Sequence, residues 1–205
     1  MNQSSITETT SNTSHLVAGN SKIEVNRAAL LSLVNAIERG KEARASILYK
    51  NGIDLDNGEW FPQQAWLNAF HEIAESLGGM NLLLIGQAIV DNAEFPSISN
   101  LEEGLRFIDV AYHLNHRLDG KMMFNSETSK MTEGIGHYAL TEFDAKKKSA
   151  TMVCSNPYPS KFDEGIITQI VRKFKPKESR ERIHHDLSQG SRMKGNNACA
   201  YTITW

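Results

Sequence analysis

The first half of the chain repeats hydrophobic residues at the spacing of an amphipathic helix. In successive segments, apolar side chains recur at i, i+3, i+4 and i+7, which places them on one helix face. Glycine, Asn-Gly and proline signals separate these segments. The pattern predicts helices over 26–40, 62–78, 81–92 and 101–116, with helical character resuming over 41–51. The segment 81–92 is apolar on most sides and is therefore expected to be central.

The pattern changes after Gly120, where polar and apolar residues begin to alternate. The runs HYALTEFD and ATMVCS flank a charged turn, and RIHHDLS and CAYTITW flank a glycine-containing turn, so two hairpins are predicted. A helical pattern from Phe162 to Phe174 lies between them. We therefore predict an α+β fold, with N-terminal helices packed on a C-terminal antiparallel twisted sheet of about four strands and an intervening helix.

Residues 1–21 are rich in Ser, Thr and Asn and contain few large apolar side chains. Such a segment buries too little surface to offset its ordering entropy, so it is predicted to be a flexible tail. The remainder, 22–205, is predicted to be a single ligand-binding domain.

Composition narrows the range of partners. The chain has 205 residues, with 22 Lys and Arg against 24 Asp and Glu, and no basic excess that would indicate nucleic-acid binding. No apolar run approaches the ~20 residues of a membrane span. The two cysteines make no disulfide framework, and the first residues do not form a secretory signal. A reducing, cytoplasmic location is expected.

The last third of the chain carries a recognisable motif. A helix with Phe162, Gly165 and Ile166 is followed by a hairpin segment running from Ser191 through Gly195 to Cys199, then Ala-Tyr-Thr-Ile. Over roughly 134–205 this arrangement resembles the 4-vinyl reductase domain family, which has a cysteine where Ser191 stands. That family shares a fold with the haem-based nitric oxide and oxygen sensor domains and with subunits of the Golgi transport tethering complex.

The resemblance implies a pocket between the helices and the sheet. On that basis, we expect a non-catalytic sensory domain that holds a small apolar or aromatic ligand and signals to a downstream protein. A homodimer is a further expectation, since several relatives form one. The expected ligand contacts are aromatic or polar side chains: Trp66, Tyr112, His113, His137 and Tyr158.

Two alternative functions stay open. A haem or other tetrapyrrole protein would use a neutral histidine before the sheet, with His113 as the candidate ligand and His116 beside it. The region 153–158, however, lacks the arginine with which the haem sensors bind the propionates. The interpretation favoured for both histidines is that they stabilise a helix C-terminus. The second alternative is an interaction subunit without a ligand, as in the Golgi relatives.

Neither a metal site nor a catalytic site is predicted. Some relatives hold zinc with cysteines of the terminal hairpin, but serine is a poor zinc ligand, so Cys199 is interpreted as a small buried side chain. A rearranged site that adds Cys154, His184, His185 and Asp186 is the alternative. No nucleophile elbow, zincin motif or nucleotide-binding glycine motif occurs, so an enzymatic function is disfavoured.

Two local patterns leave alternatives open. Alternation along the strand that begins near His137 puts this residue and Tyr138 on opposite faces, so one is core and the other faces solvent or a pocket. The segment Asn156-Pro-Tyr-Pro is either a rigid rim that presents Tyr158 to a ligand or a rigid connection whose tyrosine packs on the domain.

Overall fold

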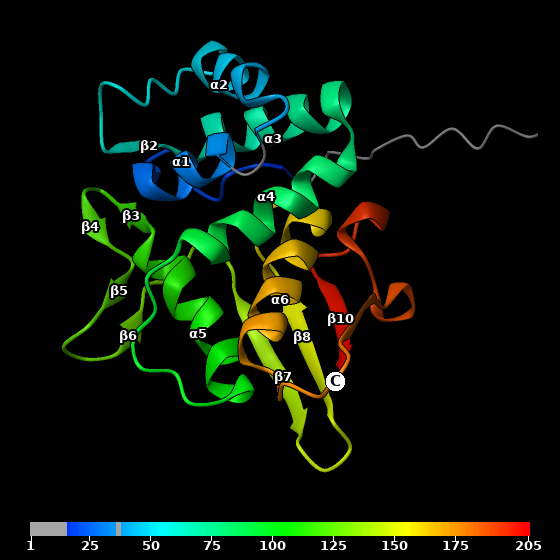
Figure 1. Ribbon diagram of the computed structural model, residues 1–205. Helices are drawn as coiled ribbons and strands as arrows, with labels where there is room; N and C mark the ends of the chain where they lie inside the picture. The colour runs from blue at the N-terminus through cyan, green and yellow to red at the C-terminus, as the bar shows by residue number, and fades with distance from the viewer. Residues whose placement is uncertain (1–15, 36–37) are drawn as a thin grey trace, which may run out of the picture.

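The computed structural model describes residues 16–35 and 38–205 (Figure 1). Its helices are α1 (Arg27–Asn35), α2 (Lys41–Lys50), α3 (Gln63–Leu77), α4 (Gly79–Asn92), α5 (Leu101–Leu114) and α6 (Ser160–Phe174). Its strands are β1 (Ile23–Asn26), β2 (Trp60–Pro62), β3 (His116–Leu118), β4 (Lys121–Met122), β5 (Phe124–Asn125), β6 (Lys130–Met131), β7 (Tyr138–Asp144), β8 (Ser149–Cys154), β9 (Arg182–His185) and β10 (Cys199–Thr204). Two short 3₁₀ turns, Leu187–Gln189 and Arg192–Lys194, lie between the last two strands.

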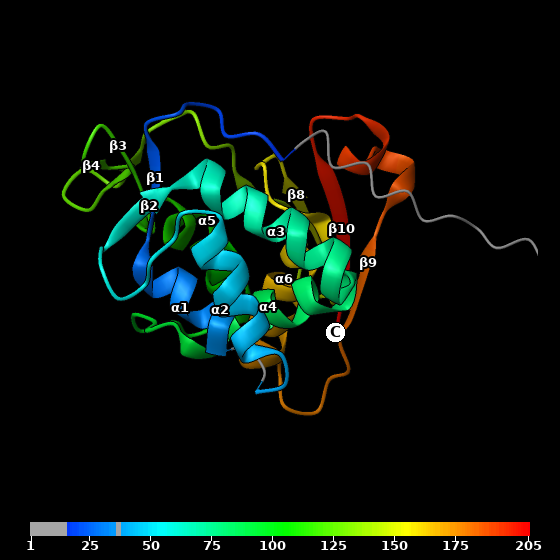
Figure 2. The same ribbon diagram turned by 90° about the horizontal axis from the view of Figure 1, so that it is seen from above.

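The predicted α+β architecture is confirmed. The C-terminal sheet is antiparallel with the order β7-β8-β10-β9, and α6 is the helix between its two halves. Helices α5 and α6 cover one face of this sheet, and α4 crosses over α6 (Figure 1). In Figure 1, α1, α2 and α3 form a further group above α4, on the side away from the sheet, and Figure 2 views this group from above.

Capping and burial explain two of the predicted helices. Asn100 caps the N-terminus of α5, and its side chain accepts a hydrogen bond from the Glu103 backbone nitrogen. The Glu103 carboxylate in turn accepts one from the Ser99 backbone nitrogen, as in a capping box. Helix α4 buries residues on several sides, including Ile85, Ala88 and Val90, as its central position requires.

The prediction that the first half is purely helical is wrong. Strands β1, β2 and β3 pair with one another and with β4 in a second sheet, of order β2-β1-β3-β4. Their three- and four-residue lengths are too short to show an alternating pattern. The fourth predicted helix, 101–116, ends at Leu114, and His116 is the first residue of β3.

The predicted second hairpin is present, because β9 and β10 pair antiparallel, but its connection is longer than the predicted turn. β10 pairs with β8 on one side and with β9 on the other, and the two 3₁₀ turns replace a tight turn between β9 and β10. Alternation indicates strands but cannot order them in a sheet.

At the N-terminus, residues 1–15 of the predicted tail lie outside the described residues, as does Ile37 of the first predicted helix. Leu16, which the prediction placed in the tail, is buried. Its carbonyl oxygen accepts a hydrogen bond from the Gln64 side chain of α3. None of the described helices has both the length and the apolar character needed to cross a membrane.

Candidate functional site

A cavity of about 470 Å³ lies among α1, α4, α5 and α6. Most of its wall is apolar, and α4, α5 and α6 contribute most of the apolar side chains, including Ile89, Phe107, Ile108, Phe162 and Ile166. Exposed lining residues occur at Ala28 of α1 and over 92–94, just after α4. The cavity is therefore buried among the helices and opens to solvent beside the segment that joins α4 to α5.

Aromatic and polar side chains gather on one part of the wall: Trp66, Tyr112, His116, Tyr138 and Tyr158. They come from α3, α5, β3, β7 and the segment after β8, and each is at most 7 % exposed. Because both halves of the sequence supply them, the fold has to be complete before this part of the wall exists.

Hydrogen bonds fix the orientations of the histidine and the three tyrosines and the positions of their protons. The His116 Nδ1 lies 2.6 Å from the Tyr112 carbonyl oxygen, so this nitrogen donates. In the neutral imidazole, Nε2 is then the acceptor, and the Tyr158 hydroxyl, 2.6 Å away, donates to it. The Tyr112 hydroxyl donates to the Ile135 carbonyl oxygen at 2.6 Å, and the Tyr138 hydroxyl donates to Asp163 at 2.6 Å. All three phenol protons are thus donated within the protein.

The predicted contact residues separate into two groups. Trp66, Tyr112 and Tyr158 line the cavity, whereas His113 and His137 do not. His116 and Tyr138 line it without having been selected. Strand alternation allows either His137 or Tyr138 to be the core residue, and the structure buries Tyr138. His113 and His116 were equivalent in the sequence because the helix was expected to include both.

The segment Asn156-Pro-Tyr-Pro is held from both sides. The Asn156 side-chain oxygen accepts a hydrogen bond from the Tyr158 backbone nitrogen at 2.8 Å. The guanidinium of Arg192 donates to the Asn156 carbonyl oxygen and, at 2.9 Å, to its side-chain oxygen. Tyr158 is 2 % exposed. It therefore packs inside the domain, as the rigid-connection interpretation has it, and also faces the cavity.

Burial keeps this region uncharged. Desolvation lowers the pKa of His116 to about 4, although its hydrogen bond to the Tyr112 carbonyl group opposes the shift. Desolvation also raises the pKa of Tyr158 above its usual range. At neutral pH the aromatic part of the cavity wall therefore presents a neutral imidazole and neutral phenols.

This shift of His116 predicts acid sensitivity. An unfolded histidine has a pKa near 6.5, so the unfolded state binds more protons than the folded state as the pH falls from about 6.5 to 4. We expect the free energy of unfolding to decrease by about 2 kcal/mol more in the wild type than in His116→Gln between pH 7 and pH 5. Urea titrations at both pH values measure this difference, and parallel pH profiles would contradict it.

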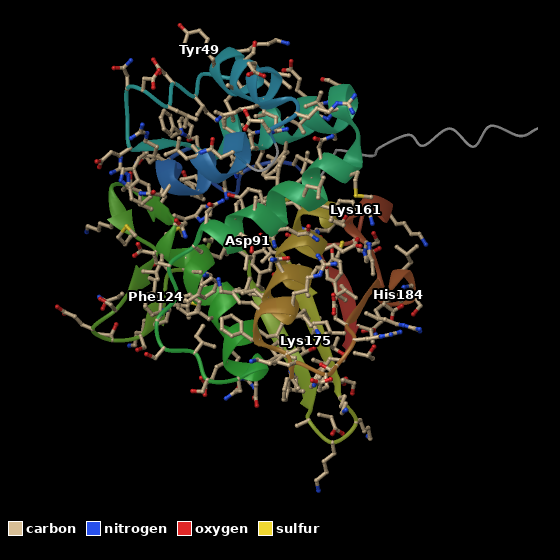
Figure 3. The ribbon with its side chains drawn as sticks, in the orientation of Figure 1. Tyr49, Asp91, Phe124, Lys161, Lys175 and His184 are labelled. Atoms are coloured by element: carbon tan, nitrogen blue, oxygen red, sulfur yellow. The ribbon has the colours of Figure 1, made fainter. Side chains whose placement is uncertain are left out.

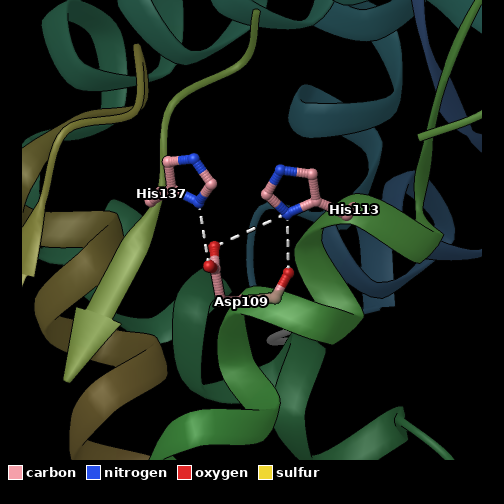
Figure 4. Close-up of side chains that lie close together, drawn as sticks. All are labelled: Asp109, His113 and His137. Carbon is pink, nitrogen blue, oxygen red and sulfur yellow. Dashed lines mark hydrogen bonds and ion pairs between the residues drawn. The ribbon is translucent and has the colours of Figure 1, made fainter. Parts of the chain in front are cut away.

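A second polar cluster lies on the opposite side of α5. Figure 4 shows Asp109 and His113 on this helix facing His137, which directly precedes β7. The His137 Nδ1 lies 2.9 Å from the Asp109 carboxylate, and the His113 Nδ1 lies 3.5 Å from it. Among the described residues, this is the group of His, Cys, Asp and Glu side chains close enough to share a metal ion.

Cys199 lies in no such group within the described residues. Its sulfur instead accepts hydrogen bonds from the backbone nitrogen and the side chain of Arg192. Ser191 lies 3.9 Å away, between hydroxyl oxygen and sulfur.

Comparison with known proteins shows the fold. No family model matches the sequence, and no curated protein is a significant match. An H-NOX protein from S. oneidensis, in the Fe(II)NO ligation state, superimposes with a TM-score of 0.56 at 11 % identity, covering 86 % of this chain and 97 % of that one. An oxygen-binding H-NOX domain related to soluble guanylate cyclases gives 0.56 at 15 % identity, covering 86 % and 90 %.

A third structure, whose description concerns haem redox potential and porphyrin distortion, gives a TM-score of 0.53 at 14 % identity, covering 85 % of this chain and 91 % of that one. At these identities the likeness establishes that the chain has the H-NOX fold and leaves its ligand open. The fold implied by the sequence resemblance is thus supported, while membership of that superfamily and the specific relation to 4-vinyl reductase domains stay predictions.

Proposed function

We propose that this protein is a non-catalytic ligand-binding domain whose cavity takes a small, neutral, largely apolar molecule. The observation that carries the proposal is the cavity of about 470 Å³, apolar over most of its wall and lined elsewhere by a hydrogen-bonded histidine and three tyrosines. Convergent polar groups in a mainly apolar pocket are typical of small-molecule sites. Sensory output through a downstream protein, and a homodimer, remain parts of this proposal.

The wall favours a ligand without charge. Glu94 is the one charged side chain among the lining residues, and it lies at the exposed segment after α4. A charged group placed beside His116 and Tyr138 would lose its hydration without gaining an opposite charge from the wall. A neutral ligand avoids this cost.

The hydrogen bonds indicate how the polar end of the ligand would be recognised. Tyr112, Tyr138 and Tyr158 donate their hydroxyl protons within the protein. The Tyr158 oxygen also accepts from the Gln63 side chain at 3.4 Å, so the oxygens of Tyr112 and Tyr138 are the acceptors offered to a ligand. A ligand that carries one N–H or O–H donor on an apolar body therefore suits this wall better than a ligand that carries only acceptors.

Haem is the second candidate, and the likeness to H-NOX structures favours it. His116 is a neutral imidazole on the cavity wall, as a haem ligand would have to be. Both of its ring nitrogens are already hydrogen-bonded, however, and His113, the histidine selected from the sequence, lies off the cavity. No lysine or arginine is among the lining residues to bind the haem carboxylates. These residues do not fit haem, so we assign the cavity to a neutral molecule.

An interaction subunit without a ligand is less well supported. Such a protein would fill its interior with its own side chains, whereas this cavity is large enough for a molecule of two or three rings.

Binding of a neutral fluorescent probe tests the proposal. N-phenyl-1-naphthylamine is apolar, carries a single N–H donor and fluoresces more strongly in apolar surroundings. We expect one molecule to bind per chain with a dissociation constant in the micromolar range. Ala111→Trp places an indole on the cavity wall and should weaken binding at least tenfold, because the ring occupies the space that the probe needs.

Arg106→Trp is the matched control. It adds the same ring to the same helix at an exposed position outside the lining, where it removes only a surface ion pair with Glu102. This variant should bind the probe as the wild type does. A parallel titration with hemin decides between the two candidate ligands. If hemin gives a Soret band that is lost in His116→Gln, and the probe does not bind, haem would replace the neutral molecule as the proposed ligand. Binding of neither compound would exclude both.

A further inference from the structure

The cluster on the far side of α5 from the cavity has the composition of a metal site. Asp109 and His113 are four positions apart on α5 (i, i+4) and therefore share one helix face. His137 reaches them from the start of β7, and one ring nitrogen of each histidine and a carboxylate oxygen of Asp109 all lie within 4.8 Å of one another. From these residues we infer a site for a first-row divalent metal ion of the zinc class, bound by Asp109, His113 and His137.

The donor set selects the class of metal. Two imidazole nitrogens and one carboxylate suit Zn²⁺ and its transition-metal neighbours, whereas Mg²⁺ and Ca²⁺ prefer all-oxygen sites. Bonds of about 2.0–2.1 Å around a tetrahedral ion hold ligand atoms roughly 3.3 Å apart. The three side chains would therefore have to move together by about 1 Å, a distance that small side-chain rotations cover.

Each ligand is oriented by a hydrogen bond to a group other than the proposed ligand atoms. The Tyr138 backbone nitrogen donates to the Asp109 Oδ1 at 2.9 Å. The His113 Nδ1 bonds the Asp109 carbonyl oxygen at 2.8 Å, and the His137 Nε2 lies 3.1 Å from the Glu133 carboxylate. Ligating histidines usually have such a carbonyl or carboxylate partner on the other ring nitrogen.

His113 supplies an independent sign that a partner is missing. Its side chain is fully buried, and its Nε2 has no hydrogen-bond partner among the described residues. When Nδ1 donates to the carbonyl oxygen, Nε2 carries a lone pair, and no described group donates a hydrogen bond to it. A histidine placed only to stabilise a helix end would gain nothing from burying this nitrogen.

The position of His137 is fixed by its backbone. The His137 nitrogen donates to the Ser155 hydroxyl at 3.1 Å, and its carbonyl oxygen accepts from the Ser155 nitrogen at 2.9 Å. Gly136 precedes it at φ 73°, and a Cβ there would overlap the Ser155 carbonyl group. The histidine therefore leaves the strand in one direction, toward α5.

Charge and access also suit a divalent cation. The Asp109 and Glu133 carboxylates together balance two positive charges when both imidazoles are neutral. The His137 side chain is 31 % exposed, while that of Asp109 is 16 % exposed. This graded exposure leaves one side open for entry of the ion and for a water molecule as the fourth ligand, as in zinc sites with three protein ligands.

Zinc titration of the full chain, after removal of metals with a chelator, tests the inference. We expect one Zn²⁺ per chain by native mass spectrometry and calorimetry, with a micromolar or lower dissociation constant. Added Co²⁺ should give the visible absorption of a four- or five-coordinate ion with nitrogen and oxygen ligands. His137→Gln should weaken Zn²⁺ binding at least 100-fold, and Glu133→Gln, which removes the outer partner, by up to about tenfold.

His184→Gln is the control, because this exposed histidine on β9 lies well apart from α5 (Figure 3). It should bind Zn²⁺ as the wild type does. Absence of stoichiometric binding by the wild type, or unchanged affinity in a folded His137→Gln, would show that the cluster is only a network of ion pairs. Probe binding in the cavity should persist in His137→Gln, so failure of this inference is distinguishable from failure of the proposed function.

Discussion

Gly165→Ala is expected to lower the free energy of unfolding by about 3 kcal/mol, at the upper end of the cost of overpacking. Gly165 of α6 faces Gly86 of α4 where the two helices cross, and a Cβ added at Gly165 would overlap the carbonyl oxygen of Leu83. The obstacle is backbone, so no side chain can turn aside and the helices must separate. Urea denaturation followed by circular dichroism measures the loss.

Gly86→Ala is also expected to lower the free energy of unfolding, because its added methyl group would overlap the Phe162 carbonyl oxygen. Because both substitutions push the same two helices apart, the double variant should lose clearly less than the sum of the single losses. Gly79→Ala, at the first residue of α4 with open space around it, is the matched control and should change stability by less than about 0.5 kcal/mol. A loss below 1 kcal/mol in Gly165→Ala would contradict the close crossing.

Arg192→Met is expected to cost about 3–5 kcal/mol at pH 7, because it leaves the Asp163 carboxylate buried without its cation. Both side chains are at most 1 % exposed. Burial raises the pKa of Asp163, and Arg192, Tyr138 and Asn156 oppose that rise. Without Arg192 the folded-state pKa rises further, so the loss should be full above that pKa and should shrink as the pH falls and the carboxyl group takes up a proton.

A double-mutant cycle isolates this pair. Asp163→Asn in the Arg192→Met background removes the uncompensated charge and should restore at least half of the lost stability at pH 7. Additive losses in the double variant would show that the two side chains do not act as a pair. Since Arg192 also bonds Asn156, probe binding in these variants reports whether the segment that carries Tyr158 has moved.

Helix periodicity predicted much of this fold, because long helices repeat their signal. Trp66, Phe70 and Ile73 mark the buried face of α3. β1 and β3 gave no such signal, since a strand of three or four residues shows too little alternation to be distinguished from the end of a helix. Their pairing is long-range and depends on tertiary contacts.

The pocket was expected from the family resemblance, and its contact residues were chosen by residue type rather than by position. Aromatic side chains such as Tyr112 and Tyr158 were selected because they combine a large apolar body with a polar tip. His116 could not be distinguished from His113, because the direction of each side chain depends on where α5 ends, and the helix ends at Leu114, two residues before the predicted end. The grouping of Asp109 with His137 requires the packing of β7 on α5, and no local pattern encodes that contact.

The position of β10 inside the C-terminal sheet sets an order of assembly. β7 and β8 are neighbours in sequence and can pair as soon as both exist, whereas β9 has no partner in the sheet until residues 199–204 are available. Until then, one edge of β8 carries unpaired backbone groups, which other chains can recognise. Closing this gap joins segments far apart in the sequence, a slow kind of step. The nascent domain is therefore most vulnerable to association with other chains just before its interior strand is inserted.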